Sequence, residues 1–418
     1  MRLLVVSQYF WPETFRVNDL VAELVRRGHG VTVLTGVPNY PEGRIDPAFA
    51  RDPARFASYA GAEVVRVPLV PRGSGSVQLA LNYLSFVIAG LTLGLWRLRG
   101  RHFDAIVAIQ LSPVTSALPA LALRRLKRAP LLMWVLDLWP DSLAAIGVVH
   151  SPRVLGWVGA LVGFIYKRCD RVLVQSRAFV ANVEKYAGNT SRIRYFPGWA
   201  EPIFEEPLAG VEAASEVAPY RETFNVLFAG NIGDAQDFPA ILDAAHALRD
   251  EPNLRWLILG DGRAAPWLRD EVERRSLAGR VVLLGRHPIE RMPSFFRAAS
   301  VLLVALKKDP IFAMTIPGKV QSYLATGLPI VGMLDGEGAA VIEQAGAGLV
   351  CAAGAGQQLA GRVRVLMRMP AHERAAMGER GRRYCEQEFS RDNLITALTT
   401  WAEELIQARS PQAPKRPR

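Results

Sequence analysis

The chain has 418 residues, half of them hydrophobic, which excludes a single small domain and allows two domains with separate cores. Its three cysteines stand alone, without a Cys-x-x-Cys pair or a histidine at ligand spacing, so a reducing compartment is expected and a structural zinc site is not. The net charge of +11 comes from the first half, because residues 1–200 hold 24 Lys and Arg against 12 Asp and Glu, and the remainder holds 26 against 27. An anionic partner, either nucleic acid or a lipid surface, is therefore expected for the first half.

Short apolar strands alternate with helical stretches from end to end, which is typical of doubly wound parallel sheets in the α/β class. The predicted strands are 3–7, 31–35, 64–67, 105–109, 131–135, 172–175, 193–196, 225–229, 254–259, 281–284, 301–304, 329–331 and 348–350. The first strand starts directly after Met1 and Arg2, with no basic leader and apolar stretch before it, so no secretory signal is expected and the protein should be cytoplasmic.

The loop after the first strand contains no glycine. It reads QYFWPETFRVNDL over residues 8–20, whereas a dinucleotide-binding domain would have Gly-x-Gly-x-x-Gly at this point. A nicotinamide or flavin enzyme is therefore not expected.

Two apolar stretches in the first half end in basic residues. Residues 77–96 are followed by Arg97, Arg99 and Arg101, and residues 154–166 are followed by Lys167 and Arg168. Apolar surface edged with arginine and lysine is typical of a helix that lies at a membrane interface. Residues 77–96 are also long enough for a membrane-spanning helix, which is a second interpretation. A buried or interdomain helix is a third interpretation.

The expected domain boundaries follow from the positions of prolines and charged residues along the chain. Residues 1–200 form the first domain, and residues 201–222, with several prolines and a run of Glu and Ala, form a linker. Residues 223–390 form the second domain, 391–409 a C-terminal helix and 410–418 a disordered Pro/Lys/Arg tail. Two Rossmann-like domains facing one cleft are the simplest architecture.

The segment 311–332, IFAMTIPGKVQSYLATGLPIVG, resembles a helix that binds an anion, followed by a buried strand. Thr315 is a candidate cap, Pro317 suits the first turn, and Lys319 adds a positive charge where the backbone amides of Gly318 and its neighbours point outward. Such a helix start favours a phosphate or diphosphate. An ordinary surface helix is the alternative.

Several motifs together resemble retaining glycosyltransferases of family 4 with the GT-B fold, in the branch that builds colanic acid, capsule and O-antigen repeat units. The motifs are QYFWPETFRVNDL, RRGHGVTVLTG, VPNYPEG, DLWPDS, YFPGWAEPIF, FAGNIGDAQ, LGDG and IPGKVQSYLATG. The likeness covers nearly the whole chain, up to about Arg409. The resemblance implies two Rossmann-like domains, with a nucleotide-sugar donor site in the second and an acceptor site in the first. It also implies reaction without a bound metal or other cofactor.

On this basis the donor diphosphate site is assigned to Gly230, Asn231, Gly233, Gln236, Pro317, Gly318 and Lys319. The glycines of the 230–233 turn would let further amides approach the diphosphate. Glu337, after a buried strand, would face the donor sugar, or alternatively water. Glu13 and Asp137 are acceptor-side candidates, with Asp137 as an orienting carboxylate or, alternatively, a helix cap.

Some positions depart from the family pattern. Many relatives carry two glutamates eight residues apart, where this chain has Met314 and Ser322. Many also have Arg and Lys where Asn231 and Gln236 stand, and a His where Leu136 stands. Diphosphate binding would then depend on Lys319, with help from Lys307 or Lys308.

The resemblance implies a hexosyl- or N-acetylhexosaminyltransferase that moves a sugar from a UDP-sugar to an undecaprenyl diphosphate-linked acceptor. We expect it to be peripheral on the inner face of the plasma membrane. A GT-B sugar-nucleotide epimerase is the alternative enzyme, and a non-catalytic basic binder of membrane or nucleic acid is the alternative outside enzymes. Nucleic acid is disfavoured, because the positive charge is interleaved with apolar stretches and no nucleic-acid-reading motif is recognised.

Overall fold

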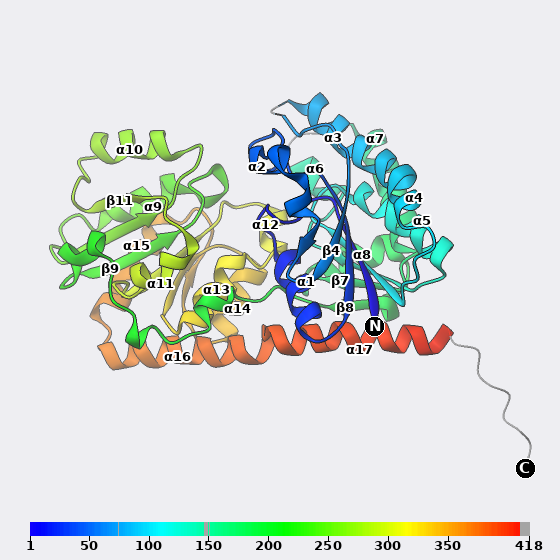
Figure 1. Cartoon of the computed structure of the whole chain (residues 1–418). Helices are drawn as coiled ribbons and strands as arrows, with labels where there is room; N and C mark the ends of the chain where they lie inside the picture. The colour runs from blue at the N-terminus through cyan, green and yellow to red at the C-terminus, as the bar shows by residue number, and fades with distance from the viewer. Residues whose placement is uncertain (74, 146–148, 150, 410–418) are drawn as a thin grey trace, which may run out of the picture. The chain divides into compact units, whose positions relative to one another are not determined.

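The computed structural model describes residues 1–73, 75–145, 149 and 151–409 (Figure 1). The chain divides into two compact units, one made of Met1–Pro197 together with the segment from Asp392 onward, and one made of Gly198–Arg391. The tail 410–418, expected to be disordered, lies outside the described residues.

Unit 1 is built on a parallel sheet with the strand order β3-β4-β2-β1-β5-β6-β7-β8, in which only β3 runs antiparallel to its neighbour. Its strands are β1 (Arg2–Ser7), β2 (Gly30–Gly36), β3 (Ser58–Tyr59), β4 (Ala62–Val67), β5 (Ala105–Gln110), β6 (Leu131–Val135), β7 (Arg171–Val174) and β8 (Ile193–Tyr195). Its helices are α1 (Arg16–Arg26), α2 (Pro47–Arg51), α3 (Ser76–Ala89), α4 (Leu95–Arg97), α5 (Leu118–Lys127), α6 (Asp141–Ala145), α7 (Pro152–Tyr166), α8 (Phe179–Ala187) and α17 (Arg391–Arg409). One π-helical turn, η2 (Gly90–Gly94), joins α3 to α4.

Unit 2 is built on a second, wholly parallel sheet with the order β11-β10-β9-β12-β13-β14. Its strands are β9 (Phe224–Ala229), β10 (Leu254–Leu259), β11 (Val281–Gly285), β12 (Val301–Ala305), β13 (Ile330–Met333) and β14 (Gly348–Cys351). Its helices are α9 (Phe238–Ala247), α10 (Ala265–Arg274), α11 (Met292–Phe296), α12 (Pro310–Met314), α13 (Gly318–Thr326), α14 (Glu337–Gln344), α15 (Gly356–Arg368) and α16 (Ala371–Glu388). Buried apolar side chains cover both faces of this sheet, as a parallel sheet requires.

The predicted α/β class with two parallel sheets is confirmed, and each predicted strand overlaps a strand of the structure. The strand that the sequence did not predict is β3, whose two residues are too few to produce an alternating pattern.

The predicted linker at 201–222 is wrong. This segment forms three short 3₁₀ helices, η5 (Pro202–Phe204), η6 (Leu208–Gly210) and η7 (Ser215–Tyr220), inside unit 2. Phe204, Leu208 and Val217 are buried in the same core as strands β9 and β10. The prolines therefore shape a packed segment, and the boundary between the units falls earlier, between Pro197 and Gly198.

The C-terminal helix α17 packs on unit 1 although it follows unit 2 in the sequence. Arg27, the residue after α1, pairs with Asp392 near the start of α17, and Arg409 at the end of α17 pairs with Asp170 (2.7 Å). Between these points the Trp401 ring lies 6.1 Å from that of Phe196. The chain thus completes its first unit with its last described helix.

Candidate active site

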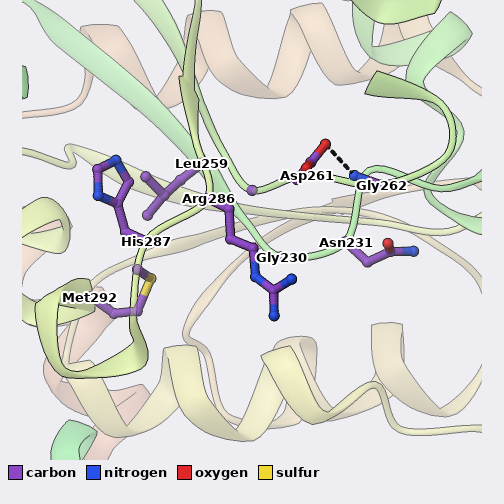
Figure 2. A pocket seen from close by; sticks show the side chains of 9 residues that line it. Gly230, Asn231, Leu259, Asp261, Gly262, Arg286, His287 and Met292 are labelled. Atoms are coloured by element: carbon purple, nitrogen blue, oxygen red, sulfur yellow. Dashed lines mark hydrogen bonds between the residues drawn. The ribbon is translucent and has the colours of Figure 1, made fainter. Parts of the chain in front are cut away.

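The strand order of unit 2 indicates the edge of its sheet at which a ligand is expected to bind. Chain order reverses between β9 and β12, and parallel sheets bind ligands at the carboxyl ends of their strands beside such a reversal. The loops after β9, β10 and β11 enclose a cavity of about 430 Å³ at this edge (Figure 2). It is lined by Gly230, Asn231, Leu259, Gly260, Asp261, Gly262, Arg286, His287 and Met292.

Lys319 reaches this edge from the first turn of α13. The ammonium nitrogen lies 3.6 Å from the centre of the Phe228 ring, at the end of β9. It has no hydrogen-bond partner among the described residues and is covered from solvent. Burial lowers the pKa of Lys319 to about 7. A buried cation without an acceptor is suited to an anionic ligand, because an ionic partner would recover the free energy lost on desolvation.

The start of α13 differs from the prediction in its cap. Thr315 does not cap this helix, since its hydroxyl donates to the carbonyl of Ile311 in the preceding helix (3.0 Å). The N-cap is Pro317, which has no side-chain acceptor. The first amides of α13 are consequently left without a capping side chain, next to Lys319.

A second uncapped helix begins beside the first. Glu337 is the first residue of α14, and the N-cap, Gly336, offers no side chain. A Cβ added at Gly338 would lie 2.9 Å from Pro317 Cδ, so the starts of α14 and α13 are in close contact. Glu337 is half-buried there. Two positive helix ends therefore converge near Lys319.

The amides of the 230–233 turn do not lie free for a phosphate, contrary to the expectation from sequence. Three of them already donate within the protein: Gly230 to Leu259 O (2.8 Å), Ile232 to Asp261 O (2.8 Å) and Gly233 to Gln236 Oε1 (3.1 Å). The Gln236 side chain thus accepts a hydrogen bond from within its own turn.

The glycines of this region allow neighbouring protein groups to approach closely, because they carry no side chain. A Cβ on Gly230 would lie 2.5 Å from Cε of Lys319, so this glycine makes room for the lysine. A Cβ on Gly260 would lie 1.8 Å from the carbonyl oxygen of Gly230, and one on Gly262 would lie 2.4 Å from that of Ile232. The LGDG motif therefore packs the loop after β10 against the loop after β9.

Sequence reasoning missed the contribution of the loop after β11. Figure 2 shows Arg286 and His287 pointing in opposite directions. The His287 ring is held by Leu284 O (3.0 Å) and Arg291 (2.9 Å). Arg286 is exposed and makes no ion pair with any residue that the structure describes. The available signal was its position just past the end of a parallel strand.

The two lysines proposed to help Lys319 follow the end of strand β12. Lys307 pairs with Asp234, while Lys308 is exposed. Glu201 from the segment before η5 brings a carboxylate to α13, because the Ser322 hydroxyl donates to it. The chain thus has a carboxylate beside Ser322, at one of the two positions where many relatives carry glutamate.

Glu13 lies at the carboxyl edge of the unit 1 sheet and joins two loops. Its Oε1 accepts from the amides of Asn39 and Tyr40 (2.7 Å each), and its Oε2 accepts from that of Phe10 (3.1 Å). Burial raises the pKa of Glu13 in spite of these bonds. Its geometry is that of a carboxylate that holds the loops after β1 and β2 together.

Asp137 follows β6 at the same edge of that sheet. Trp139 Nε1 donates to its Oδ2 (3.1 Å), and burial raises the pKa of the Asp137 carboxyl. Asp137 is thus held at the carboxyl edge of the sheet. The structure gives no direct contact between Asp137 and Glu13.

Two family models match the chain in succession. A glycosyl transferase 4-like domain matches residues 14–199, and a glycosyl transferases group 1 domain matches residues 223–369. The two family models identify the chain as a glycosyltransferase, and its fold is the GT-B fold. The chain belongs to family 4 of these enzymes.

A curated relative agrees with this assignment, and solved structures agree with the fold. The putative colanic acid biosynthesis glycosyl transferase WcaI of Escherichia coli (strain K12) is 24% identical over 342 residues, which span 78% of this chain and 82% of WcaI. Anabaena Alr3699/HepE in complex with UDP has a TM-score of 0.70 at 15% identity, covering 97% of this chain and 100% of that one. Sucrose-phosphate synthase from Thermosynechococcus elongatus has a TM-score of 0.70 at 15% identity, covering 97% and 99%. The transferase assignment replaces the epimerase and non-catalytic alternatives.

Proposed function

We propose that this enzyme transfers a sugar, with retention, from a UDP-sugar to a lipid-linked saccharide during synthesis of a surface polysaccharide such as capsule or O-antigen. The observation that carries the proposal is the buried ammonium of Lys319, which has no hydrogen-bond partner in the described part of the chain and lies beside two uncapped helix starts. The UDP-bound and UDP-glucose-bound forms of HepE support a uridine donor, and the name of WcaI supports polysaccharide synthesis.

The proposed reaction breaks the bond between the anomeric carbon and a diphosphate oxygen, and forms a bond from that carbon to an acceptor hydroxyl oxygen. Lys319 and the helix starts would stabilise the negative charge that develops on the leaving diphosphate. The acceptor proton would pass to a departing phosphate oxygen, so no strong protein base is required. In this scheme Asp137 orients the acceptor, Glu337 binds donor-sugar hydroxyls, and Glu13 positions the acceptor loops.

We predict that transfer needs no divalent metal, because Lys319 would supply the charge that a metal ion otherwise contributes. Turnover should be the same in EDTA and in EDTA followed by excess Mg²⁺ or Mn²⁺. Activity that is lost in EDTA and restored by either ion would contradict this assignment of Lys319.

The affinity for a UDP-sugar should fall as pH rises above about 7. Free Lys319 has a pKa of about 7, and a bound diphosphate would raise it toward or beyond the ordinary lysine value of about 10.4. The complex is favoured when Lys319 is protonated, so binding above pH 7 takes up a proton and weakens by up to about tenfold per pH unit. Calorimetry with UDP-glucose at pH 8, in buffers of different ionisation enthalpy, should give close to one proton taken up. No proton uptake would remove Lys319 from the diphosphate site.

The acceptor and the location are the parts of the proposal that concern unit 1. We propose undecaprenyl diphosphate-linked saccharide as the acceptor and the inner face of the plasma membrane as the place of reaction. The charge of residues 1–200 supports an anionic surface as a partner.

A binding panel tests the donor class. UDP, GDP and dTDP would be titrated against the full chain, with UDP expected to bind at least tenfold more tightly than the others. Equal affinities, or preference for GDP or dTDP, would overturn the uridine assignment.

A further inference from the structure

The helical stretch Val77–Arg97 is, among the described residues, the one that is long and apolar enough to cross a membrane, and α7 is a shorter apolar helix. We infer that this stretch does not span the bilayer and instead docks unit 1 on an anionic lipid surface through one face. The lipid surface would present the proposed lipid-linked acceptor, so the purpose of this docking rests on the proposed function.

One face of the stretch is built into unit 1. Asn82 is fully buried, and its side-chain oxygen accepts from Gln8 Nε2 (2.7 Å) and from the Tyr9 hydroxyl (3.2 Å). Its amide nitrogen donates to Val70 O (2.6 Å). Phe86 is also fully buried on this face. A spanning orientation would break these bonds inside hydrocarbon, which is strongly unfavourable.

The opposite face exposes a continuous apolar stripe. Its members are Val77, Leu81, Leu84, Ile88 and Leu91, spaced four, three, four and three residues apart. This spacing keeps the five side chains on one side of the helix. Val77 is 76% exposed, and Trp96 near the end of the stretch is 60% exposed.

The same spacing is compatible with a coiled-coil seam between two copies of the chain, but the residues that flank the stripe are not. No charged residue lies between Val77 and Trp96, whereas coiled coils place charges beside the seam to fix the partner. A lipid surface requires only the apolar stripe and cations at its edge.

The cations lie at one end of the stretch. Lys127, the last residue of α5, donates to the carbonyls of Leu98 (2.6 Å) and Arg101 (2.8 Å), which brings the basic end of α5 to this end. Arg99, Arg125 and Arg128 are exposed there and make no ion pair within the part of the chain that the structure describes. Charge and apolar surface thus complement an anionic bilayer.

Each of the two apolar helices ends in an aromatic side chain with an arginine over it. The Arg99 guanidinium lies 4.3 Å from the Trp96 ring, and that of Arg168 lies 3.7 Å from the Phe164 ring. Paired aromatic and basic side chains are suited to the headgroup region.

The surface also lies close to the acceptor-side candidate. Tyr83 of α3 has its ring 6.4 Å from that of Trp139, which hydrogen-bonds Asp137. Leu155 and Gly156 of α7 line a cavity with Pro140 and Asp141. Both apolar helices therefore flank the loop that carries Asp137.

The test is flotation of the full chain with vesicles of phosphatidylethanolamine and phosphatidylglycerol. The variant Leu84→Asn/Ile88→Asn should lose at least tenfold in vesicle partition, and Val365→Asn, which changes an exposed apolar residue of unit 2, should lose nothing. Arg99→Glu should weaken binding several-fold. Arg97 and Arg101 are left unchanged, because Arg97 donates to Arg66 O and Arg101 pairs with Glu63.

Three outcomes would overturn the inference. They are equal flotation of the stripe variant, retention of the parent in membranes after alkaline carbonate, and a parent dimer that the stripe variant converts to monomer without any vesicle binding. UDP titration of the same variants separates the two proposals, because loss of vesicle binding with unchanged UDP affinity concerns this surface alone. Normal vesicle binding with no UDP affinity would contradict only the proposed function.

Discussion

Replacing Lys319 with alanine is expected to weaken UDP binding by about 1.5–3 kcal/mol, or roughly 10- to 150-fold, the range for a charged hydrogen bond. The fold should survive, since the ammonium makes no hydrogen bond with any residue that the structure describes and removal of a desolvated cation relieves a cost. Isothermal titration of UDP measures the change. Arg368→Ala is the control, because Arg368 is an exposed cation of the same unit at the C-terminal end of α15 and should leave the affinity unchanged. Unchanged affinity in folded Lys319→Ala would place the diphosphate elsewhere.

Gly260→Ala is expected to destabilise unit 2 by about 2–5 kcal/mol, combining backbone strain with overpacking. Gly260 has φ of +145°, and its new methyl would lie 1.8 Å from the Gly230 carbonyl oxygen. The loops after β9 and β10 would have to separate, so UDP affinity should fall at least tenfold.

Gly279→Ala separates the two causes in the Gly260 experiment. Gly279 also has a positive φ, +76°, but no atom lies within 4 Å of its added Cβ. It should cost only about 1 kcal/mol and leave UDP affinity unchanged. Urea unfolding and UDP titration of both variants measure this difference. Equal losses would mean that close packing of the two loops is unimportant.

The sheets were predictable because the central parallel strands, such as β5, β6, β12 and β13, are buried on both faces and are therefore short apolar runs. The helix start at Gly318 was predictable for a local reason: proline, glycine and lysine at the start of a helix act through neighbouring residues. Lys319 lies beside the end of β9, and its binding of a diphosphate is a proposal.

The errors and omissions concern contacts between segments distant in sequence. Thr315 has the composition of a cap, yet its hydroxyl bonds within the preceding helix. Phe204 and Val217 stand among prolines, and only the folded core shows that they are buried. The contribution of Arg286 depends on three separate loops meeting at one sheet edge, and the contact of Glu201 with Ser322 spans 121 residues. No local pattern specifies such pairs.

The most direct test of the central claim is transfer itself. The purified full chain would be incubated with UDP-sugars and an undecaprenyl diphosphate-linked saccharide in vesicles, and the lipid products would be read by mass spectrometry. The account predicts a lipid product heavier by one sugar residue, formed from a UDP-sugar and strongly reduced in Lys319→Ala. Release of free sugar or an epimerised nucleotide sugar without any heavier lipid, across the whole donor panel, would contradict it.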